Sequence, residues 1–177
     1  ADDGNAPDQM AGDGVYSAEV SVPVDISVLE AVFEVNAEAV GKSPASARMV
    51  VPVTHAPAND HFNERAGLSG RRIVLADYTN RGATTEEGER RHYYVRPQKT
   101  VWFTWTAPRN GRADLWLRGS DFDTVLAVYR GSSLNSLRRV ARNDDYGQNL
   151  TSRVRCIVRR GRTYQFVVDG WGGDEGD

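Results

Sequence analysis

The chain has 177 residues, of which 40% are hydrophobic and 26% charged, and this balance excludes both a disordered tail and a membrane protein. Its single cysteine, Cys156, excludes an internal disulfide and a cysteine-based zinc site. The net charge of −2 hides an uneven distribution, because residues 1–56 carry nine acids and two bases whereas residues 57–177 carry 15 acids and 20 bases. This asymmetry predicts two structural units.

Three segments in the first 56 residues have the pattern of strands: 15–22, 29–40 and 47–53. The Glu and Ala content of residues 29–40 would also suit a helix, but the alternation of apolar and polar positions favours a strand. Three strands bury too little surface for a sandwich of their own. The segments DGNAPD at 3–8 and AGDGVY at 11–16 resemble the end of an immunoglobulin-like repeat. The resemblance implies that residues 1–56 are a partial immunoglobulin-like β unit followed by a linker.

Two prolines among small residues mark that linker, between Val51 and Asp60. After it, short apolar segments recur at roughly ten-residue spacing, separated by Gly, Asn, Asp or Pro. These segments are residues 72–76, 101–106, 112–118, 124–129, 138–142, 153–158 and 163–169, while only residues 59–68 suit a short helix. The pattern predicts an all-β chain with an antiparallel β-sandwich over residues 57–177.

Several sequence blocks in this second unit resemble, in their order, the bacterial pre-peptidase C-terminal domain. They are NDHF at 59–62, GATTEEGERRH at 82–92, VWFTWTAP at 101–108, GSDFDTVLAVY at 119–129, NDD at 143–145, SRV at 152–154 and TYQFVVDG at 163–170. The resemblance implies a jelly-roll type β-sandwich attached to a larger secreted bacterial protein, often calcium-dependent and without catalytic activity. In that family one more strand follows the Asp-Gly turn, so the resemblance also implies that the last strand is absent here.

Side chains that carry oxygen gather in the loops of the second unit. Asp121 and Asp123 stand two residues apart at a strand entry, so both project to one side. Because Ca²⁺ takes six to eight oxygen ligands from irregular loops, a calcium site is expected there. The predicted ligands are Glu86, Glu89, Asp121, Asp123, Asn143, Asp144 and Asp145. The alternative is that these residues cap turns and strand ends by accepting hydrogen bonds from local N–H groups.

Two tryptophans predict an exposed aromatic platform. If residues 101–106 and 112–118 pair as a hairpin, Trp102 lies opposite Trp116 on the polar face, beside Asp114 and Arg118. Such a platform would bind a sugar. The alternative is that a long loop covers both rings as a small second core.

Catalytic patterns are missing from the sequence: the three histidines lack metal-ligand spacing, and Cys156 alternates with Val154 and Val158 as a buried residue would. The chain is therefore expected not to be an enzyme. The function predicted is a non-catalytic extracellular accessory module, stabilised by calcium, that binds a polysaccharide or a protein fibre. The alternative is a self-assembling extracellular subunit in which other copies complete unfinished sheet edges. Nucleic acid and membrane insertion are not expected.

Overall fold

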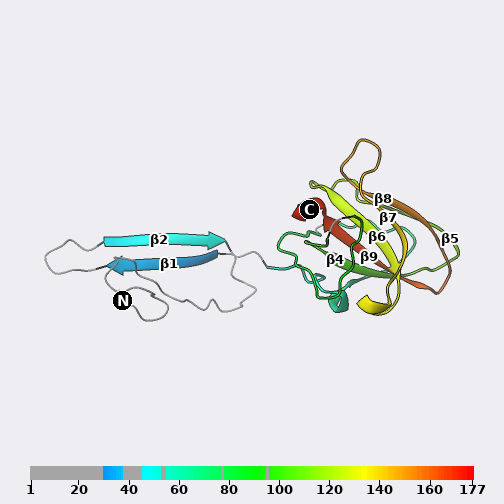
Figure 1. Cartoon of the computed structure of the whole chain (residues 1–177), viewed down its shortest axis with the longest axis horizontal. Coiled ribbons are helices and arrows are strands. Elements are labelled where there is room, and N and C mark those ends of the chain that lie inside the picture. The colour runs from blue at the N-terminus through cyan, green and yellow to red at the C-terminus, as the bar shows by residue number, and fades with distance from the viewer. Residues whose placement is uncertain (1–29, 38–44, 53–54, 77, 95) are drawn as a thin grey trace. The chain divides into compact units, whose positions relative to one another are not determined.

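The computed structural model describes residues 30–37, 45–52, 55–76, 78–94 and 96–177, and the chain divides into two compact units, Ala1–Val53 and Thr54–Asp177 (Figure 1). The sequence places this boundary three residues later, within the same linker. Regular structure in the described residues consists of strands and three short 3-10 helices. The described residues are therefore all-β, as predicted. Within the described part of the chain, no helix has the length and apolar composition needed to cross a membrane.

The described part of the first unit is an antiparallel pair of strands, β1 (Glu30–Ala37) and β2 (Ala45–Pro52). Phe33 stands opposite Met49 near the middle of the pair. The period of two in residues 29–40 thus correctly favoured a strand over a helix. The expected strand at residues 15–22 lies outside the described residues.

The second unit contains two sheets. One has five strands in the order β3-β4-β9-β6-β7, with β3 parallel to β4 and the other pairs antiparallel. Its strands are β3 (Ala66–Leu68), β4 (Val101–Thr106), β9 (Thr163–Gly170), β6 (Thr124–Arg130) and β7 (Arg138–Asn143). The other sheet pairs β5 (Gly111–Trp116) with β8 (Arg153–Val158).

Both faces of the five-stranded sheet are covered, and this explains the continuous apolar sequence of β6. One face packs against β8 through a core that includes Phe103, Val128 and Phe166 on the large sheet and Cys156 on β8. Cys156 is buried, as its alternation with two valines predicts. The opposite face carries a second core, which comprises Phe62, Trp102, Ala127, Tyr129, Leu137 and Val167.

One sequence prediction about local structure is wrong, and another is confirmed only in part. Residues 72–76 form bends and irregular chain rather than a strand, and Val74 there is 80% exposed. Residues 59–68 contain a 3-10 helix at Phe62–Glu64 and then β3, which is held by pairing with β4. A three-residue strand is too short to show a period in sequence, so only its distant partner defines it. The remaining strands of the second unit end within two residues of their predicted limits.

The predicted hairpin between residues 101–106 and 112–118 is also wrong. β4 pairs with β9 and β3, whereas β5 pairs with β8 in the other sheet. The intervening loop is tied at Ala107 to the β8–β9 turn, since the Ala107 N–H donates to Arg162 O at 3.0 Å. Trp102 is consequently 0% exposed and Trp116 43% exposed. The two rings do not form a shared platform.

Candidate metal centre

Three carboxylates meet where the start of β6 lies beside the end of β7 in the five-stranded sheet. Asp123 directly precedes β6, and Asp144 and Asp145 directly follow β7. Because β6 and β7 are antiparallel, the start of one lies beside the end of the other. One oxygen from each carboxylate lies within 4.8 Å of the others. These three residues, called the acid cluster below, were all among the predicted calcium ligands.

The acid cluster holds like charges in a partly desolvated place. Burial raises the pKa of Asp144 to about 6, with further contributions from the negative charges of Asp145 and Asp123. The pKa of Asp123 is raised as well, first by burial and then by Asp145 and Asp174. Both shifts disfavour the charged carboxylates, so the cluster is unfavourable to folding at neutral pH without a counter-ion.

Two oxygens of the cluster have no hydrogen-bond partner among the described residues. Asp123 Oδ1 and Asp144 Oδ1 are both buried and accept no hydrogen bond. A buried acceptor left without a donor costs about 1–3 kcal/mol, more if it is charged. A divalent cation would satisfy both atoms and offset the repulsion at once.

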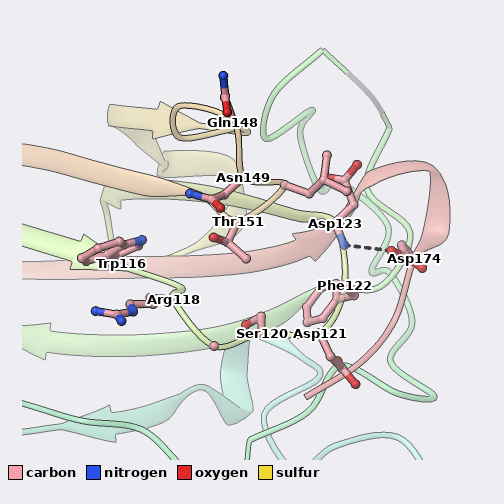
Figure 2. Close-up of a pocket in the computed structure, with 12 residues that line it drawn as sticks. Trp116, Arg118, Ser120, Asp121, Phe122, Asp123, Gln148, Asn149, Thr151 and Asp174 are labelled. Atoms are coloured by element: carbon pink, nitrogen blue, oxygen red, sulfur yellow. Dashed lines mark hydrogen bonds between the residues drawn. The ribbon is translucent and has the colours of Figure 1, made fainter.

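A fourth carboxylate, that of Asp174, reaches the same region. Its Oδ2 accepts a hydrogen bond from the Asp123 N–H at 2.8 Å (Figure 2). Sequence reasoning missed Asp174 because it lies far from the other carboxylates along the chain. The acidic run Asp174-Glu175 after two glycines was the only local signal.

Hydrogen bonds to two distant loops hold the C-terminal segment that carries Asp174. The Asn80 N–H donates to Gly176 O at 3.1 Å, and the Gly176 N–H donates to Asn80 Oδ1 at 2.7 Å. The Asp177 N–H donates to Asp121 Oδ1 at 2.7 Å, and the Asp121 N–H donates to Asp177 O at 3.2 Å. One reciprocal pair holds Gly176 against the loop at Asn80, and the other holds Asp177 against the chain that leads into β6.

Two of the predicted ligands, Asp121 and Asn143, make capping contacts. The Asp121 carboxylate accepts from the Asp177 backbone and from Arg81 Nη2 at 3.1 Å. Asn143 Oδ1 accepts from the Arg153 N–H at 2.9 Å and so links the end of β7 to the start of β8. Neither residue belongs to the acid cluster. For these two, the structure shows the capping contacts that the alternative interpretation describes.

Glu86 and Glu89 lie in another place, over the second core. Glu86 accepts a hydrogen bond from the backbone N–H of Phe62. The Glu89 side chain is 1% exposed and accepts from Thr100 Oγ1 at 3.0 Å and from Trp102 Nε1 at 3.1 Å. Both carboxylates thus satisfy buried donors, and the structure does not bring them to the acid cluster.

An open groove of about 890 Å³ adjoins the acid cluster (Figure 2). Asp123 and Asp174 line one end of this groove, and Trp116 and Arg118 line the other. Residues 148–151 form one wall. The groove therefore joins an exposed aromatic ring to the carboxylates.

Asp114, predicted to bind a ligand, is engaged in an ion-pair network. It accepts two hydrogen bonds from Arg153, at 2.8 and 2.6 Å, and one from Arg155 at 3.1 Å. The hydrogen bond from Arg153 is the main reason that the pKa of Asp114 is lowered to about 2. Of the four residues predicted to bind a ligand, Trp116 and Arg118 line the groove.

The raised pKa of Asp144 predicts an unusual pH dependence for the metal-free protein. Between pH 3.8 and about 6 the folded chain binds more protons than the unfolded chain, so stability should fall as the pH rises across this window. Asp114, with its pKa lowered to about 2, loses its contribution as the pH falls below 3.8, and Glu175, whose pKa is lowered, loses its own below 4.5. The raised pKa values of Asp123 and Asp169 act in the same direction as that of Asp144, so the Asp144 contribution is the difference from a variant that lacks its carboxyl group. The test is the urea midpoint of metal-stripped protein against pH, compared with Asp144→Asn. Parallel curves for the two proteins would contradict the assignment.

No protein-family model matches this chain, and no curated protein or solved structure matches it either. Its function is therefore inferred from the side chains and their geometry. The acid cluster offers oxygen ligands for a hard cation, and the groove beside it offers a mixed aromatic and polar surface.

Proposed function

We propose that the second unit is a calcium-stabilised, non-catalytic β-sandwich module that binds a polymer within a larger exported bacterial protein. The sequence blocks that resemble the pre-peptidase C-terminal domain support the extracellular setting. The packing of the β5–β8 sheet on one face of the five-stranded sheet supports the sandwich.

One observation carries the calcium proposal: three clustered carboxylates, two of which hold a buried oxygen without a hydrogen-bond donor. All the candidate ligand atoms are oxygens, which favours a hard cation over zinc or copper. The candidate ligands come from irregular loops at strand ends. Such loops suit Ca²⁺, which accepts variable coordination geometry, better than Mg²⁺, which requires a nearly ideal octahedron. Asp174 brings a further carboxylate close to Asp123.

Bound calcium would connect the start of β6, the end of β7 and the C-terminal segment. Its role would be structural, because it would replace charge repulsion in the acid cluster by ligand bonds. The absence of catalysis is supported by the position of His92, which is buried and pairs through Nδ1 with the Tyr129 hydroxyl at 3.0 Å. His92 therefore packs within the second core, against Trp102 and Tyr129.

Calcium is expected to raise the melting temperature of the metal-free chain. Binding that is restricted to the folded state stabilises it by about 2.7 kcal/mol when free calcium is one hundred times the dissociation constant. Isothermal titration at neutral pH measures the affinity, and thermal unfolding measures the stabilisation. A melting temperature that calcium does not move would contradict the proposal.

Two matched variants make this experiment specific. Asp144→Asn removes one cluster charge, so it should stabilise the metal-free protein at neutral pH and abolish the response to calcium. Glu86→Gln removes a carboxylate that lies outside the acid cluster and should keep the calcium response. If calcium raised the melting temperature of both variants equally, the ion would not bind at the acid cluster.

A further inference from the structure

The groove beside the acid cluster has two chemically different ends. Trp116 and Arg118, at the end of β5 and just beyond it, form one end, and Asp123 and Asp174 form the other (Figure 2). Its volume of about 890 Å³ lies in the range of ligand sites, about 300–1,000 Å³. Both ends are therefore available to one extended ligand.

Trp116 is exposed but held in place. The guanidinium of Arg153 lies 4.6 Å from the centre of the Trp116 ring and 4.9 Å from that of Tyr146. Arg153 is itself fixed by two hydrogen bonds to Asp114. The indole is thus presented at the groove by a rigid support, which lowers the entropy lost when a ligand stacks on it.

Two polar side chains that make no hydrogen bond within the described residues line the groove next to this ring. Arg118 and Gln148 make no hydrogen bond or ion pair with any described residue, although Arg118 Cζ lies 5.4 Å from the Trp116 ring centre. Both side chains are exposed. A guanidinium and an amide in this position can donate to ligand oxygens without breaking a hydrogen bond or an ion pair within the protein.

We infer that this groove binds a segment of a polysaccharide chain. A sugar ring offers C–H groups to an aromatic ring and hydroxyls to amide, guanidinium and carboxylate groups, and the groove presents the partly exposed Trp116 indole together with these polar groups. The guanidinium of Arg118 and the amide of Gln148 beside an exposed indole favour a glycan, whose hydroxyls accept hydrogen bonds all along the chain. The inference rests on the proposed polymer-binding function and gives it a ligand class and a place.

The test is retention of the full 177-residue chain on insoluble cellulose, chitin and calcium alginate, with gelatin as the protein arm. Wild type should bind at least one polysaccharide, and Trp116→Ala should weaken that binding about tenfold or more. Trp116→Phe, which keeps an aromatic face, should recover part of the loss. Melting curves establish that each variant is folded.

Tyr94→Ala is the matched control, because Tyr94 is 67% exposed and does not line the groove. It should bind the polysaccharide like wild type. Three results would each overturn the inference: equal binding by Trp116→Ala and wild type, no retention on any polysaccharide, or retention on gelatin alone.

Calcium titration of the same samples tests the acid cluster separately, and Trp116→Ala should keep the wild-type calcium affinity. Glycan retention without any calcium response would contradict the metal proposal alone.

Discussion

Replacing Trp102 by alanine is expected to lower the free energy of unfolding of the second unit by about 3–5 kcal/mol. The ring is 0% exposed and packs edge-on against Phe62, at 5.1 Å between ring centres, and against His92 at 5.4 Å. Its removal opens a cavity that rigid β4 and its neighbours cannot close by collapse.

A second cost follows from the hydrogen bond that Trp102 makes. Its Nε1–H donates to the buried Glu89 carboxylate, whose side chain is 1% exposed. Alanine would leave that oxygen with the Thr100 hydroxyl as its remaining side-chain donor. Losing a donor to a buried charged acceptor destabilises the fold beyond the loss of packing.

Urea unfolding followed by circular dichroism measures this effect. Trp116→Ala is the control for removal of an indole, because Trp116 is 43% exposed, and it should cost about 1 kcal/mol or less. Equal losses from the two substitutions would contradict the assignment of Trp102 to the second core.

Gly170→Ala is expected to displace the C-terminal segment. A Cβ at this position would lie 1.6 Å from the carbonyl oxygen of Asp174, a backbone atom that cannot rotate away. The φ of −97° at Gly170 is open to alanine, so the collision and not local strain decides the outcome. We expect a loss of about 1–3 kcal/mol, together with weaker calcium binding because Asp174 moves away from Asp123.

Hydrogen exchange locates this change. The amide protons of Asn80 and Asp121, which bond to Gly176 O and Asp177 O, should exchange faster in Gly170→Ala. Gly111→Ala is the control, since nothing lies within 4 Å of a Cβ built there. Wild-type exchange at both amides in Gly170→Ala would show that the C-terminal segment is not held as described.

The carboxylates show how far the candidate site follows from the sequence. Asp123, Asp144 and Asp145 sit at the ends of strands whose patterns are readable, so their meeting follows once β6 and β7 are neighbours. Glu86 and Glu89 look equivalent in sequence but face buried N–H donors. Which carboxylates meet one another and which cap a donor depends on contacts between distant loops.

The sequence by itself determined the all-β class, the position of most strands and the inward face of β8, because each follows from the alternation of neighbouring residues. Only the tertiary structure decided that β4 pairs with β9 and not with β5. That choice buries Trp102 beneath Glu89 and leaves Trp116 exposed at the groove. The physical reason is that periodicity is a short-range property, whereas strand partners are selected by how both faces of a whole sheet are buried.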